Sequence, residues 1–250
     1  MQRRGWTVAG AGLLAVSGIV LWTERPHLWG DASADAAKVD QAVPAGQGMR
    51  TVVLSDGSEV VLAPGSRLRS RGAFGADSRE LELTGEALFT VAAADAPGTA
   101  PFIVHGNGVD VEDLGTAFVL RTVAGRLLVS VTQGMVQVSR ARTVLHEGEA
   151  QLVDSTGQVE RLSVTDARGS LAWTSGALLF HEEPLTAVVE RLERWTGRTI
   201  VVDADLATRR LTAAFESGTP DEIVDQLAAM TGARVEFRDG RWFVSRALMR

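Results

Sequence analysis

The sequence predicts one N-terminal transmembrane helix, then an all-β domain, then a small α+β domain. Three observations predict this fold class. Residues 6–22 carry no charge, short β-rich runs separated by turn residues fill residues 50–154, and apolar residues at helical spacing begin only after Trp173. The 26 glycines and the low aromatic content also favour many short elements over a long helical bundle.

Composition excludes several classes of function. The net charge of −6 offers no general attraction to phosphates, so we expect no nucleic-acid partner. The lack of cysteine excludes disulfides, thiolate-bound zinc and thiol catalysis. His181-Glu182 begins like a metalloprotease motif, but Leu185 stands where the second histidine belongs, so we read a solvated helix start there. No Walker loop or nucleophile elbow is present, and we expect no enzyme, no cofactor and no metal site.

The apolar segment Trp6 to Trp22 is about 26 Å long as a helix, close to the ~30 Å of a bilayer core. Arg3 and Arg4 precede it, which keeps residues 1–5 as a cytoplasmic stub and sends the rest outward. The same features suit a cleavable signal peptide, for which residues 32–34 (Ala-Ser-Ala) provide a distant cleavage site. In both cases the bulk of the chain is exported.

Residues 23–48 are mostly small and polar and predict a linker, so we expect folding to begin near residue 50. The β domain then spans residues 49–165. Its first hairpin turns at Asp56-Gly57, and apolar residues alternate with polar ones along residues 127–139. About ten such strands predict either an antiparallel sandwich or a stacked, solenoid-like roll, and the sequence leaves both open.

The α+β domain spans residues 173–246. One amphipathic helix is expected from Pro184 to Gly197, and a capping box at residues 219–222 begins a second helix that ends at Gly232. Strands follow each helix, the last two joined by an Asp-Gly turn at residues 239–240. We expect the order helix, two strands, helix, two strands, with both helices covering one sheet.

Other polar groups in the sequence have ordinary structural explanations. The carboxylates of Asp110, Glu112 and Asp113 could act as acid/base partners, but charges around a strand edge are usually solvated or protective, and we expect that here. Residues 106–108 (Gly-Asn-Gly) resemble the start of a dinucleotide loop but lack its third glycine, which indicates a turn. Arginines alternate along residues 67–71, which indicates an exposed strand face or, alternatively, a surface for an acidic partner.

A series of motifs stands in fixed order along the β domain. They are Leu54 to Ser58, Arg79 to Leu83 with Gly85 to Phe89, Pro101 to Val104, Leu114 to Phe118, Gly134-x-Val136-x-Val138 and Leu145-x-x-Gly148-Glu149. A further motif, Trp173-x-x-Gly176-x-Leu178-x-Phe180, follows them at the start of the α+β domain. Through these motifs the chain resembles the FecR family of envelope signal transducers. Its last part resembles the short N-terminal domain of secretins and TonB-dependent receptors.

Most of the motif positions have physical roles in folding. Asp56-Gly57 suits a tight turn, Gly85 and Gly115 permit close backbone approach, and the phenylalanines can fill a core between sheets. We therefore expect the motif residues to shape the fold and not to contact a ligand. They are Asp56, Gly57, Ser58, Gly85, Glu86, Phe89, Pro101, Phe102, Leu114, Gly115, Thr116, Phe118, Gly134, Gly148 and Trp173.

The resemblance implies a membrane-anchored periplasmic signal transducer in the bacterial inner membrane. Such a protein regulates an extracytoplasmic-function sigma factor in response to a TonB-dependent outer-membrane receptor of the iron or siderophore type. Its implied partners are the signalling domain of that receptor and the sigma factor, through contact residues that the sequence does not identify.

The N-terminus departs from the family pattern. The family's helical anti-sigma segment stands before the transmembrane helix, where this sequence has only Met1 to Gly5. Either translation starts further upstream, or the inhibitory segment is a separate chain, or it has been lost. The alternative reading is an exported envelope-binding or assembly module that uses the same scaffold without sigma-factor control.

Overall fold

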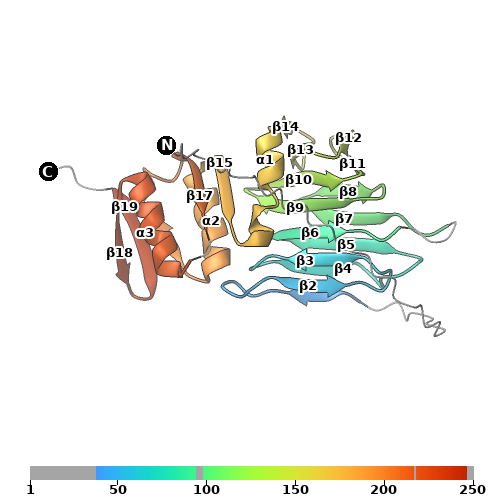
Figure 1. Ribbon diagram of the computed structural model, residues 1–250, viewed down its shortest axis with the longest axis horizontal. Coiled ribbons are helices and arrows are strands. Elements are labelled where there is room, and N and C mark those ends of the chain that lie inside the picture. The colour runs from blue at the N-terminus through green and yellow to red at the C-terminus, as the bar shows by residue number, and fades with distance from the viewer. Residues whose placement is uncertain (1–37, 94–97, 217, 247–250) are drawn as a thin grey trace, which may run out of the picture. The chain divides into compact units, whose positions relative to one another are not determined.

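The computed structural model describes residues 38–93, 98–216 and 218–246 (Figure 1). The predicted transmembrane helix at residues 6–22 and most of the predicted linker lie outside the described residues. In the part of the chain that is described, no helix has the length and apolar character needed to span a bilayer. The described residues belong to one compact unit.

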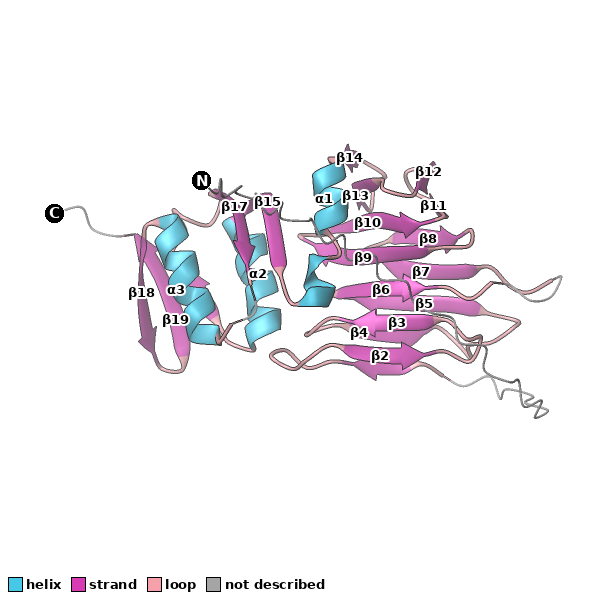
Figure 2. Ribbon diagram, viewed as in Figure 1, coloured by secondary structure: helices cyan, strands magenta, loops and turns pink. Residues whose placement is uncertain are grey.

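Fourteen strands of the described residues form two seven-stranded sheets. Figure 2 shows the strands in magenta, with β3 beside β2 and β6 beside β9. The first sheet has the order β1 (Asp40–Ala42), β4 (Arg67–Ser70), β5 (Arg79–Thr84), β7 (Phe102–Gly106), β8 (Val109–Asp113), β11 (Met135–Val138) and β12 (Thr143–His146). The second has the order β14 (Val159–Arg161), β13 (Ala150–Asp154), β10 (Arg126–Gln133), β9 (Ala117–Val123), β6 (Glu86–Thr90), β3 (Glu59–Leu62) and β2 (Arg50–Val53).

The chain moves back and forth between the two sheets and advances along both of them in the same direction. Within these two sheets, all strand pairs are antiparallel except β5 with β7, which is parallel. This order is that of a stacked roll with two flattened sides, which decides between the two architectures that the sequence left open. We call β1 to β14 the roll.

The core of the roll lies between its two sheets and is aromatic at its centre. The rings of Phe89 and Phe118 stack 5.1 Å apart, and Phe102 meets Phe89 edge-on at 6.2 Å. All three side chains are buried. The phenylalanines of the sequence motifs therefore fill the core, where they contribute most through buried apolar area.

The motif glycines allow close approach at two places. Gly85 has φ +97°, and a Cβ there would lie 2.5 Å from the Ser66 hydroxyl oxygen. Gly115 also has positive φ, but a Cβ on it would contact nothing within 4 Å. A Cβ on Gly134 would instead lie 2.3 Å from the carbonyl oxygen of Gly115. The close approach expected at Gly115 therefore belongs to Gly134, and Gly115 is needed for its backbone conformation.

The Asp56-Gly57 turn is fixed to the roll by an ion pair with little exposure. The Asp56 carboxylate accepts hydrogen bonds from the Ser58 N–H and hydroxyl, both at 2.9 Å. It also accepts one from Arg79 Nε at 2.8 Å, and this guanidinium lies over the Phe102 ring. Two motifs that are separate in sequence are thus joined in space.

The folded chain begins earlier than residue 50. Asp40–Ala42 forms β1, which pairs with β4, and Val43 is buried. The polar composition of this stretch indicated a linker, but three residue pairs with β4 and one buried valine suffice to hold it in the first sheet.

After the roll come α1 (Val164–Gly169) and the 3-10 turn η1 (Ala172–Ser175). The C-terminal lobe then comprises β15 (Leu178–Pro184), α2 (Leu185–Thr196), β16 (Ile200–Val202), β17 (Arg210–Phe215), α3 (Pro220–Thr231), β18 (Ala233–Arg238) and β19 (Arg241–Arg246). Its strands form a β15–β17 sheet and a β16–β19–β18 sheet. Both helices contact strands of both sheets.

Two expectations for this lobe were wrong. The helices pack against two sheets and not one, because β15 is a strand that the sequence analysis did not predict. His181 and Glu182 lie in a bulge of β15 and not at a helix start, and Pro184 ends that strand as the N-cap of α2. Proline favours a first helical turn, but here the buried Leu178 and Phe180 extend the strand up to it.

The caps of both helices agree with the sequence. Gly197 and Gly232 end α2 and α3 in the left-handed conformation, and Thr219 and Glu222 form the capping box of α3. We expect Thr219→Ala to lower the free energy of unfolding by about 1 kcal/mol, because it leaves the Glu222 N–H without its acceptor. Urea unfolding measures this loss. The matched variant Thr199→Ala, at an exposed site without a cap, should change stability by less than about 0.5 kcal/mol. Equal effects of the two would contradict the capping role.

Candidate functional site: the contact between the roll and the C-terminal lobe

Four charged side chains meet where the C-terminal lobe contacts the roll. Glu86 and Arg121 lie directly opposite each other on β6 and β9 of the roll. Glu183 comes from the end of β15, and Arg191 comes from α2. All four are buried or nearly so, which is rare for charged groups unless they are paired.

The Glu86–Arg191 pair is bidentate and almost fully buried. Arg191 donates from Nη2 to Glu86 Oε1 at 2.8 Å and from Nε to Oε2 at 3.1 Å, and both side chains are 3% exposed. A third donor, Nη1, reaches the Leu179 carbonyl at 3.2 Å. The guanidinium is thus bound by the roll on one side and by its own lobe on the other, in the planar geometry that arginine favours.

The second pair completes a neutral set of four. Arg121 Nη2 donates to Glu183 Oε1 at 2.9 Å, while Glu183 Oε2 is buried without a hydrogen-bond partner among the described residues. Burial lowers the pKa of Arg191 to about 10, partly offset by Glu86. For Arg121, burial also lowers the pKa, but the charges of Glu183 and Glu86 outweigh it and raise the pKa above its ordinary value. Both arginines are therefore charged at neutral pH.

Apolar packing surrounds these charges. Trp173 is fully buried and meets Trp195 of α2 edge-on at 6.4 Å. Ala63, Val61 and Leu88 of the roll belong to the same core cluster as the two helices of the C-terminal lobe. The contact between roll and lobe is therefore a continuous core, and water has little access to the ion pairs inside it.

The N-terminal segment of the described chain also contacts the C-terminal lobe. We call residues 39–48 the strap. The Val43 N–H donates to the Ser66 carbonyl at 2.8 Å, and the Gly46 N–H donates to the Arg194 carbonyl of α2 at 2.9 Å. The backbones of Gly46 and Gly197 touch, because a Cβ on either would lie 3.0 Å from the Cα of the other. The strap thus links the start of the folded chain to the end of α2.

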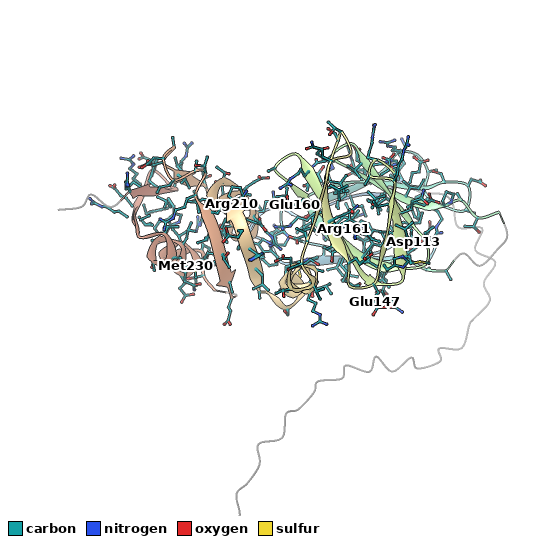
Figure 3. The ribbon with its side chains drawn as sticks, turned by 90° about the horizontal axis from the view of Figure 1, so that it is seen from above. Asp113, Glu147, Glu160, Arg161, Arg210 and Met230 are labelled. Atoms are coloured by element: carbon teal, nitrogen blue, oxygen red, sulfur yellow. The ribbon has the colours of Figure 1, made fainter. Side chains whose placement is uncertain are left out.

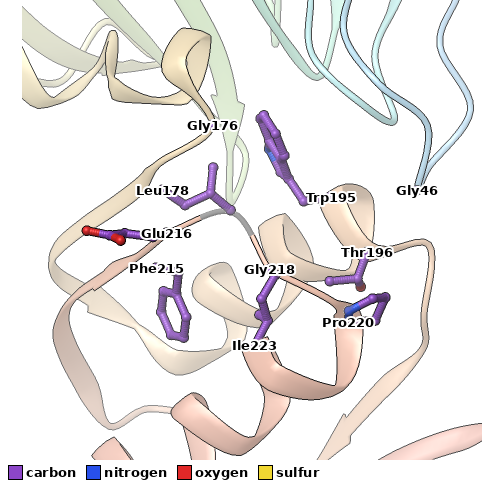
Figure 4. Close-up of a pocket in the computed structure, with 10 residues that line it drawn as sticks. All are labelled: Gly46, Gly176, Leu178, Trp195, Thr196, Phe215, Glu216, Gly218, Pro220 and Ile223. Carbon is purple, nitrogen blue, oxygen red and sulfur yellow. The ribbon is translucent and has the colours of Figure 1, made fainter.

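A small pocket opens beside this contact, with a volume of about 230 Å³ (Figure 4). Its apolar wall comes from Leu178, Trp195, Phe215 and Ile223, and Gly46 of the strap forms another part of it. Any group that entered the pocket would contact the strap and the C-terminal lobe together.

Two family models match the chain in sequence order. The model described as FecR protein matches residues 41–137, and the model described as FecR, C-terminal matches residues 177–244. Together they cover more than half of the chain. The chain belongs to the FecR family.

Solved structures are similar to this FecR-family chain over most of its length. Two crystal structures of a candidate anti-sigma factor from Parabacteroides distasonis ATCC 8503, at 2.50 Å and 1.65 Å resolution, are 27% identical to it. Their TM-scores are 0.74 and 0.73, and the matches cover 84% of this chain and 100% and 99% of theirs. No curated protein matches the chain significantly. An anti-sigma factor is a regulatory protein, in agreement with the absence of catalytic motifs in the sequence.

The FecR motif residues are distributed over the roll and do not converge on one cavity. Glu86 differs from a residue that contacts only the roll, because its carboxylate accepts a hydrogen bond from Arg191 of the C-terminal lobe. Leu114 is 43% exposed, Pro101 is also exposed, and Trp173 is fully buried beside α2. The expectation that these residues shape the fold remains a prediction for those without a described contact.

Several of the other polar candidates have partners within the chain. Arg67 pairs with Asp40 and Arg69 with Glu82 on the exposed face of the first sheet. Asp110 was expected to be solvated and its side chain is 48% exposed, while its carboxylate also lies 2.6 Å from Nδ1 of His105. Residues 106–108 form the turn between β7 and β8, as expected.

The sequence analysis did not find Arg121, Glu183 or Arg191. A weak signal exists for two of them. Arg121 follows the apolar residues 118–120 of a strand, and Arg191 lies directly before Leu192 on the buried side of a helix. An arginine inside an apolar pattern is unusual and indicates a buried partner, but the sequence does not say which one.

Asp113, labelled in Figure 3, lies at the end of β8. It was expected to be solvated, but it is half-buried because the chain turns back over it at Gly115 and Thr116. Burial raises its pKa to about 6, although the Gly115 N–H, the charge of Arg79 and the Thr116 N–H each lower it. The carboxylate accepts hydrogen bonds from the Gly115 N–H at 3.0 Å and from the Thr116 hydroxyl.

The raised pKa of Asp113 predicts a pH dependence of stability. The Asp113 carboxyl binds its proton more tightly in the native state than in the unfolded chain. Its contribution to the free energy of unfolding is therefore complete below about pH 4 and is lost as the pH rises through about 6. After discounting for solvent screening, we expect a loss of about 1 kcal/mol. Unfolding at pH 4, 5, 6 and 7 should show this loss in the wild type but not in Asp113→Asn. Glu147→Gln, at an exposed site, is the control. Parallel profiles for wild type and Asp113→Asn would contradict the assignment.

Proposed function

We propose that this FecR-family protein regulates an extracytoplasmic-function sigma factor through protein contacts. The observation that carries the proposal is the match to both FecR models in order, supported by the structural similarity to a candidate anti-sigma factor over 84% of the chain. The motif analysis, which found no catalytic constellation, favours the same class of function.

In the fuller form of the proposal, residues 6–22 anchor the protein in the inner membrane and the described residues lie in the periplasm. The C-terminal lobe receives the signal from the signalling domain of a TonB-dependent outer-membrane receptor of the iron or siderophore type. The uncharged apolar segment after Arg3 and Arg4 and the resemblance of the C-terminal lobe to the small receptor domain support this form.

The contact between roll and lobe supplies a route for the signal. A partner that binds the C-terminal lobe changes the position or stability of α2, which carries Arg191 and contacts the strap. In the sequence, the strap follows residues 1–38, which contain the proposed anchor. Because the ion pairs are buried and the backbones of Gly46 and Gly197 touch, α2 cannot move without breaking these contacts.

Transcript profiling of a strain that lacks the gene tests the proposed regulation. We expect one coherent set of genes with a shared promoter sequence to change in level, and expression of the chain to restore it. Changes without a shared promoter sequence would favour the envelope-binding or assembly module instead.

The location is tested separately. Mass spectrometry of the N-terminus of the protein from the membrane fraction should find residues 6–22 retained and preceded by a cytoplasmic segment. A mature N-terminus after residue 22 would contradict the anchor, because the protein would then be a cleaved, exported one.

A further inference from the structure

Strand β18 is an open edge of the β16–β19–β18 sheet. It pairs with β19 over six residues without a register shift, and no other strand of the described residues pairs with its far side. Natural edge strands are commonly protected by a bulge, a proline, charged side chains or a very short length, and of these β18 has only the charged side chains of Arg234, Glu236 and Arg238. Residues 233–238 contain no proline and no bulge, and they form one of the longer strands of the lobe.

The backbone of β18 presents hydrogen-bonding groups at this edge. The two-residue turn at Asp239-Gly240 has positive φ at both positions, so Arg238 and Arg241 form the hydrogen-bonded pair that closes the hairpin. Antiparallel pairs alternate, and Val235 and Phe237 therefore direct their N–H and C=O groups away from β19. Phe237 is 53% exposed, although its ring lies 4.7 Å from that of Trp242.

The side chains of β18 have a definite charge pattern. Arg234, Glu236 and Arg238 lie on the face opposite to α3 and are all exposed. In the described part of the chain, neither arginine forms an ion pair, and Arg238 lies over the Phe243 ring at 4.1 Å. Read along the strand, this face is positive, negative and positive.

We propose that β18 is a docking edge to which an extended segment of a partner protein adds as a further strand. The segment carries acidic side chains opposite Arg234 and Arg238, a basic or neutral one opposite Glu236, and apolar ones opposite Val235 and Phe237. Main-chain hydrogen bonds supply affinity, and the alternating side chains supply specificity. This inference rests on the proposed function, because it names the surface of the C-terminal lobe that a signalling partner contacts.

In the register centred on Glu236, charge disfavours a second copy of this chain as the occupant, and a dimer paired in another register is an outcome of the sedimentation test below. If two β18 strands paired antiparallel about Glu236, Arg234 of each would lie opposite Arg238 of the other, and the two Glu236 side chains would face each other. Like charges directly opposite destabilise a strand pair. The same arrangement favours a partner strand of the complementary pattern.

The first test uses a labelled peptide. The probe is Thr-Glu-Val-Lys-Val-Glu-Thr, whose pattern is complementary to β18 in both strand directions, and the control is the charge-reversed Thr-Lys-Val-Glu-Val-Lys-Thr. Fluorescence anisotropy of each peptide is titrated with the full chain in detergent micelles. We expect the probe to bind about tenfold more tightly than the control and to slow hydrogen exchange in residues 233–238. Equal affinities of the two peptides would contradict the proposed charge complementarity. Slower hydrogen exchange only in residues outside 233–238 would contradict β18 as the docking edge.

Variants of the chain distinguish the contribution of backbone hydrogen bonds to peptide binding from that of the side chains. Phe237→Pro removes one outward N–H without touching the ladder to β19 and should weaken probe binding at least tenfold, whereas Phe237→Ala keeps this donor and should weaken it by at most about threefold. Arg234→Glu with Arg238→Glu should reverse the peptide preference, and Arg142→Glu, a remote exposed control, should not. Circular dichroism verifies that each variant folds.

Two further outcomes are decisive. Unchanged probe binding by Phe237→Pro, or a dimer in sedimentation that the probe does not dissociate, would overturn the docking edge. Transcript profiling distinguishes this failure from that of the proposed function, since a normal transcript response in the Phe237→Pro strain would overturn the edge alone. Probe binding in a chain whose deletion changes no coherent transcript set would overturn the regulator instead.

Discussion

Replacing Arg191 by alanine is expected to destabilise the protein by about 3–5 kcal/mol, because it leaves the Glu86 carboxylate buried without its partner. The loss is much larger than for an exposed ion pair, since both side chains are 3% exposed and the surrounding core excludes water. Urea unfolding followed by circular dichroism measures it. Arg198→Ala, an exposed arginine just beyond α2, is the matched control and should change stability by less than about 0.5 kcal/mol.

The double variant Glu86→Met/Arg191→Met distinguishes a lost contact from an uncompensated charge. Replacing both partners by apolar side chains of similar length removes the desolvation penalty, so we expect it to recover most of the stability lost in Arg191→Ala. If the double variant is as unstable as the single one, the ion pair itself, and not the isolated carboxylate, determines the effect.

Replacing Gly197 by valine is expected to cost about 2–3 kcal/mol and to release the strap. Gly197 has φ +67°, and a Cβ there would lie 3.0 Å from the Gly46 Cα and 3.1 Å from the Ala45 carbonyl oxygen. Both the backbone strain and the collision oppose the native arrangement. Hydrogen exchange measures the release, and residues 43–48 should exchange faster in the variant.

The variant Gly232→Val distinguishes backbone strain from collision with the strap. Gly232 ends α3 with nearly the same φ of +63°, but a Cβ there would meet nothing within 4 Å. We expect this variant to share the strain and to lose about 1 kcal/mol without any change in the exchange of the strap. Equal exchange of residues 43–48 in both variants would show that the strap does not depend on its contact with α2.

Elements with local signals were predictable from the sequence. The hairpin turns at residues 56–57 and 239–240, the capping box at residues 219–222 and the helix ends at Gly197 and Gly232 each depend on a few neighbouring residues. Their conformations are decided by backbone sterics and by hydrogen bonds within one turn. The structure therefore has these elements where the residue types favour them.

The remaining features depend on distant pairing. Glu86 and Arg191 are 105 residues apart, and nothing near either residue indicates the other. The bulge at residues 181–182 is held by pairing of β15 with β17, while the local proline favours a helix. β1 similarly becomes a strand only because β4 is available beside it. Contacts of this kind arise from the packed fold, and sequence patterns alone leave them open.

The central claim is that the buried contact between roll and lobe carries the signal that this FecR-family protein transmits. A transcriptional reporter on a promoter from the regulated gene set tests it most directly, measured in strains with the wild type, Arg191→Ala or Arg198→Ala at equal protein levels. The account predicts that Arg191→Ala shifts reporter output toward the level of the deletion strain or the fully induced strain, while Arg198→Ala matches the wild type. Wild-type output and normal induction in Arg191→Ala, with its stability lowered as expected, would contradict the claim.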